Sequence, residues 1–190
     1  EIRTPMNGIL GMTELLLATP LTEKQRHMAH TVQQSSASLL TIINGILDYS
    51  KIEVGKLQLE HTDMDLSHLL DDVITLLSEV ARQKGLSLSV QIAPSIPTAL
   101  RGDPTRLRQV LLNLIGNAIK FTTKGSITVS ADCLNRNAEQ ILLRMTVRDT
   151  GVGIPPESQS RIFDAFAQAD ASPTRKFGGT GLGLAIVKQL

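Results

Sequence analysis

The sequence predicts an α+β protein in which an antiparallel helical hairpin precedes a two-layer α/β sandwich. Up to about residue 53, apolar residues recur three and four positions apart, which is typical of amphipathic helices. After residue 125, two successive segments alternate apolar and polar residues, which predicts a pair of antiparallel strands. Because strand–helix alternation stops after Lys120, the pattern does not fit a doubly wound parallel sheet.

The composition narrows the class of protein. Of the 190 residues, 42% are hydrophobic and 19% are charged, which indicates a folded core. A formal net charge of +1 and an aromatic content of 3% give no reason to expect a nucleic-acid partner. The single cysteine, Cys133, falls on the apolar side of a strand pattern and is expected in the core. No apolar run is long enough to span a bilayer.

The first 53 residues predict two helices. A helix over 2–18 is followed by a Thr-Pro break and by Thr22, which can cap a helix over 22–53. The second helix carries a heptad-like apolar seam that is formed by Met28, Val32, Leu39, Ile42, Ile46 and Tyr49. The hairpin cannot bury this seam alone, so a second copy completing a four-helix bundle is predicted. A plain oligomerisation coil explains the pattern equally well.

The rest of the chain follows a short linker at 54–56 and mixes helices with strands. In order, the patterns predict an edge strand near 57–64, a helix from Asp65 or Ser67 to Lys84, a strand over 86–92, a loop over 93–100, a helix opened by Asp103-Pro104, and two strands around a turn at 135–139. The predicted domains are therefore 1–53 and 54–190. Glu1 has no helix cap and Leu190 stops inside a helical pattern, so the chain is expected to be part of a longer protein.

Three polar residues recur late in the helix opened by Asp103. Asn113, Asn117 and Lys120 are spaced by four and three, which stacks two carboxamides and an ammonium along one side. Carboxamide oxygens can ligate a hard cation such as Mg²⁺, and an ammonium can meet a phosphate. Taken alone, however, the spacing is better explained by three solvated polar residues.

The last strand ends in a glycine-containing turn. Gly151 and Gly153 are two residues apart, which lets a flat ligand lie against bare backbone. The carboxylate of Asp149 suits an exocyclic amino group such as that of adenine. An ordinary glycine turn is the alternative interpretation.

A glycine-rich segment, 177–183, opens the last apolar helix and offers free N–H groups to an anion. It matches neither a Walker loop nor the dinucleotide fingerprint, and a flexible linker is the alternative. The polar residues 167–176 predict a mobile lid, in which Arg175 and Lys176 can reach a terminal phosphate. Phe163 and Phe166 are expected at the base of this lid, or in ordinary core.

In this order, the asparagine helix, the Asp-x-Gly-x-Gly turn, the phenylalanine pair and the glycine-rich segment resemble the ATP-binding domain of sensor histidine kinases. That fold is shared with type II topoisomerase and heat-shock chaperone ATPases. The opening residues, Glu1-Ile2-Arg3-Thr4-Pro5-Met6-Asn7-Gly8, resemble the start of the dimerisation and phosphoacceptor hairpin of these kinases. The resemblance covers nearly the whole chain. It implies ATP and Mg²⁺ as cofactors, a homodimer through the hairpin, and a response-regulator receiver domain as partner.

The resemblance also implies roles for the matching residues. Asn117, helped by Asn113, would ligate Mg²⁺, while Lys120 would approach the phosphates. Asp149 would hold the adenine amino group. The glycines Gly151 and Gly153 would form the pocket wall, and the phosphate side would be lined by Gly179, Thr180, Gly181 and Gly183.

Two further roles belong to the hairpin. Glu1 would act as general base beside the phosphoacceptor histidine, and Thr4 would orient a water for the reverse, phosphatase reaction. In the family that histidine directly precedes the Glu-x-x-Thr-Pro segment, so here it is expected just before Glu1. The histidines in the chain are expected to be surface or packing residues: His27, His30, His61 and His68. Family members continue past the last helix into further strands, so the chain alone is expected to be poorly stable.

The leading hypothesis is a protein-histidine kinase core of a two-component phosphorelay, which as printed is not expected to phosphorylate itself. It is expected in the cytoplasm, with any inner-membrane anchor in segments outside this chain. The Glu-Ile-Arg-Thr-Pro-Met-Asn-Gly start resembles hybrid kinases, whose own receiver domain follows. Two alternatives stay open: a non-catalytic ATP-binding dimerisation and docking module, and an ATP-driven clamp like the topoisomerase relatives.

Overall fold

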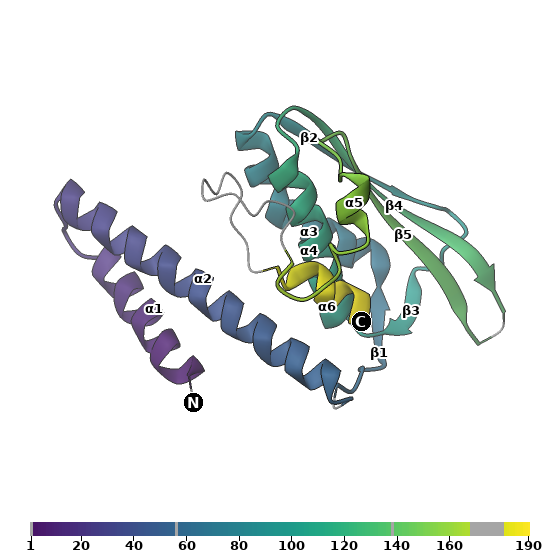
Figure 1. Cartoon of the computed structure of the whole chain (residues 1–190), viewed down its shortest axis with the longest axis horizontal. Coiled ribbons are helices and arrows are strands. Elements are labelled where there is room, and N and C mark those ends of the chain that lie inside the picture. Colours follow the sequence, from purple (N-terminus) through teal and green to yellow (C-terminus); the bar gives the residue numbers. More distant parts are fainter. Residues whose placement is uncertain (1, 56, 138, 168–180) are drawn as a thin grey trace. The chain divides into compact units, whose positions relative to one another are not determined.

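The structure is a computed structural model that describes residues 2–55, 57–137, 139–167 and 181–190. The chain divides into two compact units, Glu1–Gly55 and Lys56–Leu190 (Figure 1). The functional assignment of each predicted domain stays a prediction. Within the described ranges, no helix is both long enough and apolar enough to cross a membrane.

The first unit is a helical hairpin of α1 (Arg3–Leu17) and α2 (Glu23–Glu53), as predicted. A capping box starts α2 at Thr22: its hydroxyl accepts the Gln25 N–H at 3.3 Å, and the Gln25 side chain accepts the Thr22 N–H at 3.0 Å. The Nε of Arg3 donates to Oδ1 of Asn44 at 2.7 Å, which ties the start of α1 to α2.

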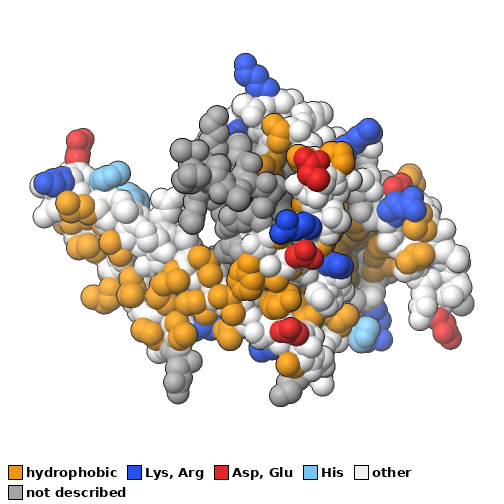
Figure 2. Space-filling model, in the orientation of Figure 1, with side chains coloured by type: hydrophobic (Ala, Val, Ile, Leu, Met, Phe, Trp, Pro, Cys, Tyr) orange, Lys and Arg blue, Asp and Glu red, His pale blue; other side chains and the backbone are white. Residues whose placement is uncertain are grey.

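Most of the predicted apolar seam of α2 is exposed in the single chain. Figure 2 shows hydrophobic side chains gathered along the hairpin. The exposed large hydrophobic residues of its two helices are Ile9, Met12, Leu15, Leu16, Met28, Val32, Leu39, Ile42, Ile46 and Leu47. A continuous apolar surface of this kind marks an interaction site in a monomer.

The second unit has two layers, as predicted. Its sheet has the order β2 (Leu86–Ile92), β4 (Gly125–Arg136), β5 (Ile141–Asp149). β2 runs parallel to β4, whereas β4 and β5 form the predicted antiparallel hairpin. The helices α3 (Leu66–Gln83) and α4 (Pro104–Phe121) cover one face of this sheet (Figure 1).

The core of the second unit lies between these helices and the sheet. Because side chains alternate along a strand, Ile127, Val129 and Ala131 of β4 all point inward and are at most 1% exposed. The helix residues packed in the same cluster are Leu66, Leu69, Leu70 and Val73 of α3, and Leu111, Ile115, Ala118 and Ile119 of α4. This packing fixes the rotation of α4 about its axis, and so decides which of its residues stay outside the core.

A second, two-stranded sheet pairs β1 (Thr62–Asp65) antiparallel with β3 (Ala99–Gly102). The predicted loop over 93–100 is therefore too long, because its last two residues belong to β3, which forms a strand only by pairing with β1.

The core position predicted for Cys133 is also wrong. Cys133 is half-buried, since the ladder is irregular between Cys133 and Asn135.

Candidate functional site

The asparagine helix begins where the sequence predicts. Asp103 caps α4: its Oδ1 accepts the Arg106 N–H at 2.9 Å, and a proline occupies the first helical position. Asn113, Asn117 and Lys120 lie outside the buried stripe of α4, and all three are half-buried. They are therefore not a freely solvated stripe. Neither asparagine side chain has a hydrogen-bond partner among the described residues, so both carboxamides can bind a ligand.

The helix α6 (Gly183–Gln189) brings the glycine-rich segment onto α4. A Cβ built on Gly183 would lie 3.1 Å from Oδ1 of Asn113, so this close approach favours glycine. Ala185 and Ile186 are buried and anchor α6 against the rest of the unit. The first and last motifs of the candidate site, predicted separately, are thus in contact.

The turn after β5 meets the end of α4. The Val152 N–H donates to the Phe121 carbonyl at 3.4 Å, and the Gly151 N–H donates to Oδ1 of Asp149 at 2.8 Å. A Cβ on Gly151 would lie only 2.6 Å from the Phe121 carbonyl oxygen, so the backbones approach closely only because residue 151 is glycine. Gly153 has a positive φ of 71°, which glycine adopts without strain.

Sequence reasoning did not identify Thr122, which follows Phe121 at the end of α4. Its side chain is only 1% exposed, yet its hydroxyl has no hydrogen-bond partner among the described residues. A buried hydroxyl without a partner is uncommon, and such groups occur where a ligand or water completes the bonding. Nothing in the sequence distinguishes this threonine, because its burial depends on residues distant along the chain.

Two lysines stabilise the last turn of α4. The Lys120 ammonium lies 4.7 Å from the centre of the Phe121 ring. Burial lowers the pKa of Lys120 below its ordinary value, because it disfavours the charged form. Nζ of Lys84 donates to the Ile119 carbonyl at 2.9 Å, which satisfies a free acceptor at the helix end. These contacts order the turn that follows Asn117.

The predicted phenylalanine pair lies beyond the short helix α5 (Pro156–Gln159). The alternative prediction, that these phenylalanines lie in the core, is wrong for Phe166, because this residue is 62% exposed. Its backbone has a positive φ of 63°. Its N–H donates to the Gly181 carbonyl at 3.1 Å, and a Cβ on Gly181 would lie 2.8 Å from the Phe166 backbone. Close packing against Gly181 therefore holds this backbone in a conformation that non-glycine residues rarely adopt.

The remaining predicted site residues divide into two groups. Glu1, Lys176, Gly179 and Thr180 lie outside the described residues. Thr4 lies exposed in the first turns of α1, in the hairpin unit. The structure thus brings Asn113 to Gly183 and joins Asp149 and Gly151 to the end of α4.

The ligand chemistry of the site rests on carboxamides. Within the described ranges, no three His, Cys, Asp or Glu residues cluster closely enough to hold a metal ion. The side chains of Asn113 and Asn117 are half-buried and have no hydrogen-bond partner among the described residues, so they are suited to a hard cation, which prefers oxygen ligands. The donor set therefore fits Mg²⁺ better than a transition metal that prefers imidazole or thiolate.

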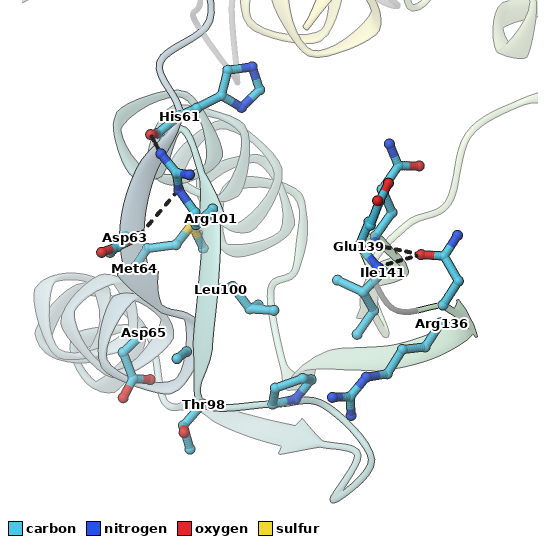
Figure 3. A pocket seen from close by; sticks show the side chains of 14 residues that line it. His61, Asp63, Met64, Asp65, Thr98, Leu100, Arg101, Arg136, Glu139 and Ile141 are labelled. Atoms are coloured by element: carbon cyan, nitrogen blue, oxygen red, sulfur yellow. Dashed lines mark hydrogen bonds and ion pairs between the residues drawn. The ribbon is translucent and has the colours of Figure 1, made fainter.

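A separate groove of about 1100 Å³ lies between the β1–β3 sheet and the tip of the β4–β5 hairpin (Figure 3). Leu100 of β3 and Ile141 of β5 lie on opposite sides of it. On the β3 side, the Arg101 guanidinium donates to the His61 carbonyl at 3.0 Å and pairs with Asp63 at 3.3 Å. None of the predicted site residues lines this groove, so it is not part of the candidate site.

The chain combines a helical hairpin with a two-layer sandwich, in which an asparagine helix lies beside a glycine turn. These features define an ATPase-type protein of two units. Residues 1–55 match the family model of the His Kinase A (phospho-acceptor) domain. Residues 102–190 match the model of histidine kinase-, DNA gyrase B-, and HSP90-like ATPases. The chain belongs to the histidine kinases.

Relatives and solved structures agree with this membership. The signal transduction histidine-protein kinase BarA of Escherichia coli (strain K12) is 47% identical over 190 residues, which are 100% of this chain and 21% of BarA. The crystal structure of full-length ShkA in complex with AMPPNP matches with a TM-score of 0.80 and 37% identity, over 99% of this chain and 38% of that chain. The crystal structure of the histidine kinase ThkA in complex with the response regulator protein TrrA matches with a TM-score of 0.57 and 26% identity, over 88% of this chain and 48% of that chain.

Proposed function

We propose that this chain is the core of a protein-histidine kinase in a two-component phosphorelay. In this function the γ-phosphoryl group of ATP passes to a histidine of the hairpin, and then to an aspartate of a response-regulator receiver domain. The protein would contribute mainly positioning and charge neutralisation. The strongest support is that the glycine-rich segment and the turn after β5 both contact α4: Gly183 lies against Asn113, and Gly151 lies against Phe121.

We assign ATP and Mg²⁺ to this site. The carboxamide oxygens of Asn117 and Asn113 would hold Mg²⁺, which when bound neutralises charge on the phosphates. The Lys120 ammonium would contact a phosphate. The Asp149 carboxylate would accept a hydrogen bond from the adenine amino group, while the glycines of its turn leave room for the ring. The complex of ShkA with AMPPNP supports this assignment.

The residues that the structure does not test keep their proposed roles. Gly179, Thr180 and Lys176 would lie on the phosphate side of the nucleotide. Glu1 would take a proton from the imidazole of the acceptor histidine, which raises its nucleophilicity, and Thr4 would orient a water in the reverse reaction.

The proposed activity is tested by adding the expected histidine directly before Glu1. With ATP labelled on the γ-phosphoryl group, we expect an acid-labile phosphohistidine on the extended chain and no label on the chain as printed. Label on His27 or His30 of the printed chain would contradict this assignment. An extended chain that binds ATP but stays unlabelled would instead favour the ATP-driven clamp or the ATP-binding docking module, and one that binds no ATP would contradict the kinase assignment.

The exposed seam of α2 supports a homodimer in which two hairpins form a four-helix bundle. We expect Ile42→Glu to raise the dimer dissociation constant at least about 100-fold, because it buries two carboxylates without partners. Analytical ultracentrifugation of the full chain measures this constant. Thr41→Glu changes the neighbouring exposed position outside the seam, and it should leave the constant unchanged. A dimer that tolerates Ile42→Glu would contradict the proposed interface.

The phosphoryl-accepting partner and the cellular location of this chain are proposed from its membership of the histidine kinases. The complex of ThkA with the response regulator TrrA supports a receiver domain as the phosphoryl acceptor. A hybrid arrangement, with a receiver domain following this chain, stays a prediction. Cytoplasmic location and a membrane anchor in segments outside the chain also stay predictions.

A further inference from the structure

We propose that Thr150 is a positioning residue for recognition of the nucleotide base, because its hydroxyl ends the β4–β5 ladder and thereby orients Asp149. The inference rests on the proposed function, in which Asp149 accepts a hydrogen bond from the adenine amino group. It concerns a residue that the nucleotide itself need not touch.

The ladder between β4 and β5 ends in an unusual way. Ile127 lies opposite Asp149, and one step further the Thr150 N–H donates to the Ser126 carbonyl at 3.2 Å, as in a regular ladder. The reciprocal bond is different, because the Ser126 N–H donates to the side-chain Oγ1 of Thr150 at 3.0 Å. The same hydroxyl also lies 3.4 Å from the Ser126 carbonyl, to which it donates. The side chain therefore takes the place that the Thr150 carbonyl would fill in a continued strand.

This replacement releases the peptide between Thr150 and Gly151 from the ladder. The chain turns there, and the Gly151 N–H reaches back to Oδ1 of Asp149 at 2.8 Å, an Asx turn. One carboxylate oxygen of Asp149 is thus held by the turn. The other oxygen has no hydrogen-bond partner among the described residues, and the side chain is exposed, so this oxygen is the one that can accept from a base.

The space that the Thr150 hydroxyl occupies is left free by Gly125. Gly125 starts β4 with a φ of 122°, and a Cβ built on it would overlap with Oγ1 of Thr150. The absence of a side chain at Gly125 therefore allows the threonine hydroxyl to reach the Ser126 backbone. Valine at position 150 has nearly the same shape as threonine, but its side chain cannot accept a hydrogen bond from Ser126. The Ser126 N–H would then bond to the main-chain carbonyl of residue 150, which rotates the peptide that holds Asp149.

The test compares Thr150→Val with Thr150→Ser, which keeps the hydroxyl, in the full chain. Titration calorimetry gives the dissociation constants of ATP and of purine riboside triphosphate, which lacks the 6-amino group. We expect Thr150→Val to weaken ATP binding about tenfold and binding of the amino-free analogue less than about twofold, in line with the loss of one charge-assisted hydrogen bond. Thr150→Ser should restore the ATP affinity of the unmodified chain.

Equal losses for the two nucleotides would overturn the proposal, since a general disturbance of the fold does not distinguish a base by its amino group. Unchanged ATP affinity in Thr150→Val would overturn it as well. Circular dichroism reports whether each variant is folded, and Thr150→Ala replaces the valine variant if that one unfolds. If the unmodified chain binds neither nucleotide, the proposed function fails, and the role of Thr150 fails with it.

Discussion

Asn117→Ala is expected to weaken Mg²⁺-dependent binding of ATP by at least about 100-fold, since loss of even an outer-shell partner of a metal site costs 10- to 100-fold. The carboxamide is half-buried on α4 and has no hydrogen-bond partner in the part of the chain that the structure describes. Its removal therefore breaks no hydrogen bond among the described residues. Alanine also has a higher helix propensity than asparagine, so α4 should stay intact. Titration calorimetry with and without Mg²⁺ measures the effect.

Two controls test whether the loss of affinity in Asn117→Ala is due to a lost metal ligand. With EDTA in place of Mg²⁺, the variant and the unmodified chain should bind ATP with equal, weak affinity, because the lost interaction is with the metal. Asn135→Ala removes a carboxamide from an exposed position on β4 and should leave both affinities unchanged. A loss of affinity that persists in EDTA would show that Asn117 contacts the nucleotide or supports the fold, and would overturn its role as a metal ligand.

Gly151→Ala is expected to reduce both stability and ATP affinity. The added Cβ would lie 2.6 Å from the Phe121 carbonyl oxygen and 2.8 Å from Oδ1 of Asp149, closer than real Cβ contacts allow. One neighbour is backbone, so the turn itself must move away from α4. We expect the free energy of unfolding to fall by about 2 kcal/mol, as in other overpacked sites. Displacement of Asp149 should weaken ATP binding at least about tenfold, the equivalent of one strong hydrogen bond.

Gly116→Ala is the matched control, because it adds the same methyl group to α4 itself. Gly116 lies inside a helix, and a Cβ built on it meets no atom within 4 Å apart from its own chain neighbours and helix backbone. The substitution should raise the free energy of unfolding by about 0.5–1 kcal/mol, since alanine loses less backbone freedom than glycine. Chemical denaturation of both variants gives these values. If Gly151→Ala kept the stability and ATP affinity of the unmodified chain, the close approach of the turn to α4 would be refuted.

The sequence predicted the elements whose signals are local. Thr22 and Asp103 cap α2 and α4 where the patterns place these helices, because a cap acts within one helical turn. The alternation that predicted β4 and β5 also predicted their pairing, since a short turn joins them. The short strand β3 was missed because its pairing partner, β1, lies far back in the chain.

The candidate site divides in the same way. From residue types and their order, the sequence alone predicted that Asn113, Asn117, Asp149 and Gly151 belong to motifs of a nucleotide-binding domain. Only the tertiary structure decided that Gly151 must lie against Phe121, and that Thr150 bonds to Ser126. It also decided that the Thr122 hydroxyl is buried with no hydrogen-bond partner in the described part of the chain. Periodicity and capping act between residues a few positions apart. Close contacts between distant motifs arise when α4 packs against the sheet, and no local pattern encodes them.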